Sequence, residues 1–344
     1  MVNNLDFSFS KEQESFRREL REFCESRLKP RVKEIETRSS IPDDIIRGMA
    51  DLGILGMTVS PEFGGSGADP ILAGIAGEEI AKADLSCATA VFFLVPAAWG
   101  YILDRYGNHE LKAQVLPKIT KGKAFLGVAS TEPHAGSDVA AIETTALKQG
   151  SEYVVNGKKM YISGVREVAE TLEEGGGFLT LAKTAPKLGS KGLSLFYMPI
   201  RNRPDVSVTY IDEWGRRGIS TGGFTFTNTR VPGTNLVGEE NRGFYLAMEG
   251  FDFARAIISL VCCGAAASAL EQGIQRIKQR KVFGRHIAGY QGIQFKLAEN
   301  YAKMEAVRLL SYKALWILAE ELKGKAVSRF ETTRAVAEAK MLAS

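Results

Sequence analysis

The sequence of 344 residues contains few cysteines and histidines, and neither is spaced for metal binding. It has four cysteines without a C-x-x-C pair and three histidines without H-E-x-x-H spacing. They are Cys24, Cys87, Cys262, Cys263, His109, His134 and His286. Zinc sites and disulfide scaffolds rely on such patterns. We therefore expect free thiols in a reducing compartment and no metal site.

A membrane-spanning segment and a large charge excess are also missing. The sequence has no run of about 18 apolar residues and no cationic leader followed by an apolar stretch. Lysine and arginine number 44 against 40 aspartates and glutamates, a formal net charge of +4. This mild surplus disfavours a dedicated nucleic-acid binder. We expect a cytoplasmic protein with no membrane and no nucleic-acid partner.

Glycine-rich nucleotide-binding signatures are absent as well. Neither G-x-G-x-x-G nor G-x-x-x-x-G-K-[ST] occurs, so there is no Rossmann fingerprint and no P-loop. One G-x-S-x-G motif stands at 218–222, but strand-like residues follow it where a hydrolase nucleophile needs a helix. Ser220 is therefore interpreted as a turn residue, and a hydrolase using Ser220 is a distant alternative.

Three regions differ in their hydrophobic pattern and together predict an α+β fold. Residues 1–120 show helical spacing that begins with a capping box at Ser10. Residues 121–235 resemble short strands of an antiparallel sandwich or barrel, with a hairpin turn at Asn156-Gly157. Residues 236–344 return to long helices, and the last one reaches the end of the sequence without a stop signal. We expect this C-terminal helical domain to be incomplete.

The segment 128–138 has the chemistry of a ring-binding or phosphate-binding loop. A buried strand ends with Ser130 and Thr131 and continues into a loop with Gly136 and Ser137. Hydroxyls and free backbone amides there can bind the polar edge of a flat ring or a phosphate. On chemistry alone, a polar strand-to-loop turn remains the alternative.

The segment 159–164 is the second candidate. Tyr161 and Ser163 are two residues apart, so on a strand they share one face. The aromatic ring could pack against a ligand ring while the hydroxyl bonds its polar edge. The alternative is an ordinary half-buried strand.

Together these segments resemble the acyl-CoA dehydrogenase family. Its pattern is a Thr-Glu-Pro-x-Ala-Gly-Ser-Asp loop followed by an Asn-Gly-x-Lys-x-Trp-Ile-Thr/Ser strand, and Tyr161 stands here where Trp is usual. Further matches follow the family's order at 61–65, 231–238, 251–255 and 280–291. The family's arrangement of a β region between two helical regions agrees with the pattern above.

The resemblance implies that FAD binds between the β region and the C-terminal helices. The residues matching the family's flavin contacts are Val128, Ser130, Thr131, Gly136, Ser137, Tyr161, Ile162 and Ser163. Arg280, Phe283 and Gln291 match positions that reach the FAD of a neighbouring subunit, which implies a homodimer or homotetramer. The matches to acyl-CoA contacts are Ser137, Asp252 and Arg255, with Ser190 as a weaker candidate.

The resemblance also implies a reaction, the α,β-dehydrogenation of an acyl-CoA thioester to a 2-enoyl-CoA. A carboxylate base takes the α proton, the β hydride moves to the flavin, and an electron-transfer flavoprotein accepts the electrons. A minority of the family place the base just before the arginine of the Asp-x-x-Arg motif, where this chain has Ala254. We assign no catalytic residue within the chain and expect the usual glutamate beyond Ser344.

Two other functions of the same fold remain open. One is a flavin oxidase or monooxygenase, and the other is a non-catalytic flavin-binding scaffold, suggested by the missing base. The acidic segment 165–177 is longer than the family's usual link. It is interpreted as a solvated loop, with a pocket rim or an electron-acceptor surface as alternatives.

Overall fold

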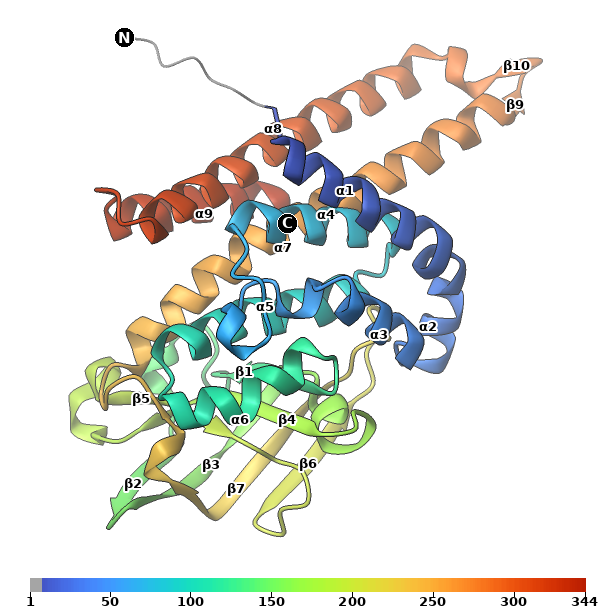
Figure 1. The fold of residues 1–344 in the computed structure, drawn as a ribbon. Helices are drawn as coiled ribbons and strands as arrows, with labels where there is room; N and C mark the ends of the chain where they lie inside the picture. Colours follow the sequence, from blue (N-terminus) through green and yellow to red (C-terminus); the bar gives the residue numbers. More distant parts are fainter. Residues whose placement is uncertain (1–7) are drawn as a thin grey trace.

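The structure, a computed structural model, describes residues 8–344 and shows two helical regions with a β region between them in sequence (Figure 1). The N-terminal helices are α1 (Lys11–Phe23), α2 (Val32–Arg38), α3 (Asp43–Asp51), α4 (Pro70–Ala83), α5 (Ala88–Tyr106) and α6 (His109–Thr120). The capping box is confirmed, because the Ser10 hydroxyl accepts from the Gln13 N–H and the Gln13 side chain accepts from the Ser10 N–H. The α+β layout predicted from the sequence is confirmed.

The strands form a mixed sheet instead of a wholly antiparallel one. They are β1 (Ala124–Ala129), β2 (Thr145–Gln149), β3 (Glu152–Ser163), β4 (Gly175–Lys183), β5 (Leu193–Met198), β6 (Val206–Ile211), β7 (Thr221–Pro232) and β8 (Leu236–Val237). The order is β6-β7-β3-β2-β4-β5-β8, and β1 pairs with β4 in parallel. Helix α5 packs on β1, so this strand lies beside the helices.

The predicted hairpin turn at Asn156-Gly157 is wrong. Strand β3 runs through this dipeptide, and its pairing with β7 shifts register between Val155 and Gly157. The Asn156 side chain accepts from the Asn228 N–H at 2.7 Å, and the dipeptide forms a bulge. Gly157 is needed there, since its φ is +151° and a Cβ would lie 2.3 Å from the Thr144 hydroxyl. The dipeptide correctly indicated a residue with φ > 0, but this residue lies in a β-bulge and not in a hairpin turn.

The C-terminal region consists of α7 (Gly243–Gln279), α8 (Gln291–Leu322) and α9 (Arg329–Ala343). Helices α7 and α8 extend together beyond the body and are joined at their tip by β9 (Lys281–Val282) and β10 (Arg285–His286) (Figure 1). By length and composition alone α7 could cross a membrane. In the structure it packs against α4, α5, α8 and α9, as a core helix does.

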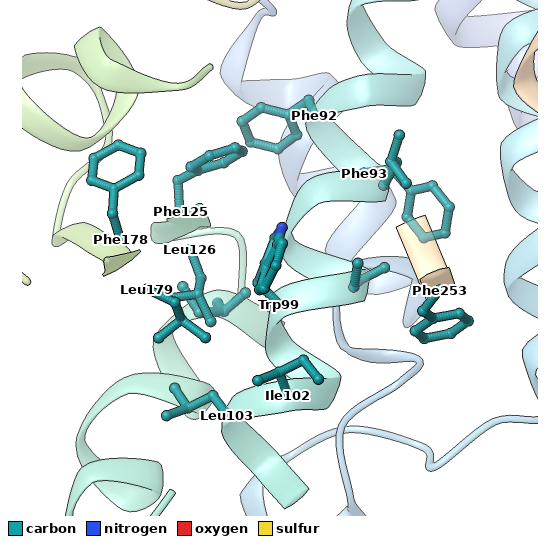
Figure 2. Close-up of a cluster of buried hydrophobic side chains, with 14 of the residues drawn as sticks. Phe92, Phe93, Trp99, Ile102, Leu103, Phe125, Leu126, Phe178, Leu179 and Phe253 are labelled. Carbon is teal, nitrogen blue, oxygen red and sulfur yellow. The ribbon is translucent and has the colours of Figure 1, made fainter. Parts of the chain in front are cut away.

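A cluster of large buried side chains joins the helices to the sheet (Figure 2). Trp99 of α5 lies between that helix and strand β1, with Leu126 on the strand side. Phe92 of the same helix packs on Phe125 of β1, with ring centroids 5.5 Å apart. This core fixes the distance between α5 and the end of β1, where the predicted loop begins.

Candidate active site

A cavity of about 360 Å³ lies where the β region meets the helices. Its lining residues come from α5, from β1 and the loop after it, from β3 and from α7. They are Val95, Val128, Ser130, Thr131, Gly136, Ser137, Val139, Tyr161, Ile162, Ser163, Met248, Phe251 and Arg255. The structure thus brings both sequence segments, 128–138 and 159–164, into one cavity.

A buried ion pair holds the loop after β1 in place. The Lys159 ammonium, whose side chain is 0% exposed, donates to Glu132 Oε1 at 2.8 Å and to the Ser130 carbonyl at 3.3 Å. Glu132 also accepts from the N–H groups of Glu143 at 2.7 Å and Thr144 at 3.1 Å. Glu132 is therefore a structural residue, because all these contacts fix the loop.

The pKa values of this pair are consistent with two charged groups near neutral pH. Burial alone would raise the pKa of Glu132, but the Lys159 charge and hydrogen bond together with the backbone N–H donors hold it below its usual value of 4.5. Burial lowers the pKa of Lys159 to about 8, against the opposing effect of Glu132. Lys159 thus still carries its proton at pH 7.

The end of β3 presents an unusually exposed aromatic residue to the cavity. Tyr161 is 65% exposed and has φ +60°, at a second shift in the pairing with β7. This backbone conformation is uncommon for a residue with a side chain. The guanidinium of Arg216, from the loop before β7, donates to the Ser163 hydroxyl at 3.3 Å. A positive charge therefore lies next to the cavity on the β side.

Helix α7 forms the opposite wall, and Asp252 lies outside its lining. Arg255 lines the cavity and lies over the Phe251 ring. Asp252 is 2% exposed and is not among the lining residues. Its carboxylate accepts from Arg255 at 3.1 Å and from Arg329 and Thr333 of α9. Asp252 thus links α7 to α9 and positions Arg255, and its predicted contact with acyl-CoA stays a prediction.

Models of one protein family match all three regions of the chain. Models of the acyl-CoA dehydrogenase N-terminal, middle and C-terminal domains match residues 10–123, 127–229 and 241–344. The chain belongs to the acyl-CoA dehydrogenase family. It is therefore an oxidoreductase that acts on acyl-CoA thioesters.

Individual relatives cover most of the chain. An acryloyl-CoA reductase (NADH) of Anaerotignum propionicum is 35% identical over 314 residues, which are 90% of this chain and 77% of that protein. An acyl-CoA dehydrogenase of Bacillus subtilis is 34% identical over 309 residues, 89% of this chain and 78% of that protein. The structure of butyryl-CoA dehydrogenase from Megasphaera elsdenii has a TM-score of 0.87 and 28% identity, covering 98% of this chain and 85% of that one.

Several residues predicted for the family site lie outside the cavity. Ser190 is in the turn Pro186–Gly192, which packs against the turn carrying the lining residue Val139. Arg280, Phe283 and Gln291 lie at the tip of the α7–α8 arm, where Phe283 is 93% exposed. Their predicted contact with the FAD of a neighbouring subunit stays a prediction.

Ser220 and the acidic segment 165–177 form a structural contact. The Ser220 hydroxyl donates to Glu167 at 2.5 Å and accepts from the Arg166 N–H at 2.8 Å. Strand β7 follows it directly, so the turn interpretation is confirmed. Glu167 is buried, and the interpretation of the whole segment as a solvated loop is therefore wrong.

Sequence analysis assigned no site role to four lining residues, Val95, Val139, Met248 and Phe251, although Phe251 stands in the matched motif at 251–255. Met248, Phe251 and Arg255 are spaced by three and four residues, so they share one face of α7. That spacing could have identified Met248 from the known motif at 251–255. Val95 had no local signal. The lining formed by the described residues 8–344 contains no aspartate or glutamate.

Proposed function

We propose that the protein catalyses the α,β-dehydrogenation of an acyl-CoA thioester and uses FAD to accept the hydride. The observation that supports this proposal is that the cavity between the β region and the helices has two different walls. Its β side carries hydroxyls, and its helix side carries apolar residues and Arg255. The hydroxyl wall suits the flat polar ring of a flavin. The apolar wall with its arginine suits an acyl chain attached to the charged CoA carrier.

The lining residues fit a flavin. The hydroxyls of Ser130, Thr131 and Ser137 make no hydrogen bond to any residue in the described range 8–344, so they are free to bind a ligand. Tyr161 offers an exposed aromatic face, and Gly136 has no side chain to block close approach. These residues, with Val128, Ile162 and Ser163, would hold FAD, which supplies a hydride acceptor when bound.

The helix wall suits the acyl-CoA. Val95, Met248 and Phe251 exclude water from an acyl group. Arg255 is held between Asp252 and the Phe251 ring, so its charge is fixed for an anionic group of the carrier. Ser137 and Ser190 remain proposed contacts of the carrier.

Residues 8–344 place no carboxylate in the lining, so the α proton has no acceptor among the lining residues. Glu249 is adjacent to Met248, but it accepts from Tyr101 at 2.7 Å and from Tyr106 at 2.6 Å. These two bonds hold its carboxylate, and Glu249 is not among the lining residues.

The partners are also proposed. The outer part of α8 exposes Phe295 and Tyr301, and the arm tip exposes Phe283. Clustered exposed apolar residues favour a protein interface. A second copy of the chain at this arm, in a homodimer or homotetramer, would cover them. An electron-transfer flavoprotein is the proposed acceptor of the electrons.

The test is an absorption spectrum followed by anaerobic addition of acyl-CoA. Bound FAD bleached by acyl-CoA supports the dehydrogenase. Rapid reoxidation by oxygen would favour an oxidase or monooxygenase, and bound flavin that no acyl-CoA reduces would favour the scaffold. Thr131→Val should weaken FAD binding ~3- to 10-fold, because it removes one hydrogen bond. Thr227→Val, an exposed threonine on β7, is the matched control and should leave FAD binding unchanged.

A further inference from the structure

A buried ring lies behind the apolar wall of the cavity. Trp99 lies one helical turn beyond the lining residue Val95 on α5, so both share a face of that helix. The Trp99 ring meets Phe251, another lining residue, edge to face with centroids 5.2 Å apart. Trp99 itself is 1% exposed. Its ring therefore lies directly behind the apolar wall.

Helix α7 is shaped to accept this ring. A Cβ at Gly250 would lie 2.6 Å from Trp99 Cζ3 and 3.0 Å from Ile102 Cγ1. The absence of a side chain at Gly250 thus makes room for the indole between the two helices. On its other side the ring faces strand β1 (Figure 2). Protein interiors are close-packed, so a ring held on both sides does not yield to a ligand at low cost.

We propose that Trp99 limits the length of the acyl chain and that the substrates are CoA thioesters of short acyl groups. This inference rests on the proposed function, since it assigns the apolar wall to the acyl chain. A short chain ends at Val95, Met248 and Phe251. A longer chain has to displace Phe251, which the Trp99 ring holds in place from behind.

The test is a series of dissociation constants for straight-chain acyl-CoAs of increasing length, measured by calorimetry on the FAD-loaded protein. Affinity should rise about fourfold with each buried methylene. It should stop rising at the chain length that reaches the Phe251 wall backed by Trp99, and we call this length the break. Trp99→Phe and Trp99→Ala should move this break to longer chains, and the alanine variant should move it further. Trp99→Phe keeps most of the packing, so it serves if the alanine variant does not fold.

Phe93→Ala is the matched control. Phe93 is a fully buried aromatic residue on the same helix, and among residues 8–344 it makes no ring contact with a lining residue, whereas Trp99 does. It should loosen the core without moving the break. An unchanged break in both Trp99 variants, or an equal shift in Phe93→Ala, would overturn the inference while leaving the proposed function intact. A protein that binds FAD but no acyl-CoA of any length would overturn both.

Discussion

Replacing Lys159 by methionine should destabilise the protein by about 3–5 kcal/mol, the usual effect of removing one partner of a buried ion pair. The side chain is 0% exposed, and its ammonium faces Glu132 at 2.8 Å. In the variant the Glu132 carboxylate keeps two backbone N–H donors but loses its counter-charge. Since Ser130 and Thr131 precede Glu132 in the loop, FAD affinity should fall as well.

The assay is urea unfolding followed by circular dichroism. In the wild type the pKa of Glu132 lies below 4.5, so the carboxylate stays ionised between about pH 8 and about pH 5.5. In Lys159→Met the uncompensated carboxylate binds a proton more readily. Because protonation removes the unpaired charge, the deficit relative to wild type should shrink as the pH falls through this range.

Two variants test whether the unpaired Glu132 charge causes the loss of stability. Adding Glu132→Gln to Lys159→Met removes the unpaired charge and keeps an acceptor for one N–H, so the double variant should regain about 1–3 kcal/mol. Lys158→Met, at the exposed neighbouring position, should change stability by less than about 0.5 kcal/mol. A Lys159→Met variant within about 1 kcal/mol of wild type, or no recovery in the double variant, would show that the pair does not hold the loop.

Three further outcomes are expected. Arg329→Met should weaken acyl-CoA binding roughly 10-fold and leave FAD affinity unchanged, because Asp252, which positions Arg255, loses a charged hydrogen bond. Arg334 is an exposed arginine on the same helix, and an equal effect in Arg334→Met would refute this role. Burial raises the pKa of Glu79, but the hydrogen bonds and charges of two arginines outweigh this effect and bring the pKa below 4.5. The stability that the ionised Glu79 contributes is therefore lost as the pH falls through that lowered pKa. Glu79→Gln should make the fall in melting temperature between about pH 5 and about pH 3 less steep. Gly176→Ala should cost about 2–4 kcal/mol in urea unfolding, since its Cβ would lie 2.0 Å from a backbone oxygen of β1, whereas Gly150→Ala, which also has φ > 0 but open space, should cost about 1–2 kcal/mol.

Local patterns were sufficient for the helices and for the residues at strand ends. The capping box at Ser10 and the end of β1 before Ser130 depend on neighbours within a few residues. The dipeptide Asn156-Gly157 was misinterpreted because a turn and a bulge both call for φ > 0. The difference is made by β2 and β7, which pair with β3 on its two sides. No single-sequence pattern shows those partners.

Long-range partners also decide the roles of charged residues. Asp252 has the spacing of a cavity residue, but Arg329, 77 positions later, draws its carboxylate toward α9. Val95 and Trp99 belong to a helix that is apolar around most of its circumference. Such a helix gives no preferred face in the sequence, and only the packing of β1 and α7 shows which side meets the cavity.

The cavity depends on all three regions of the chain. Its β wall is held by the Lys159–Glu132 pair, and its helix wall by the Asp252 network that ties α7 to α9. Trp99 of the N-terminal region packs against Phe251 of the helix wall and faces β1 on its other side (Figure 2). Breaking an ion pair in one wall should therefore weaken the binding of that wall's ligand first. Lys159→Met should mainly lower FAD affinity, and Arg329→Met should mainly lower acyl-CoA affinity. If both variants instead weakened both ligands equally, the two walls would form one cooperative unit, and the separate roles assigned to them would be wrong.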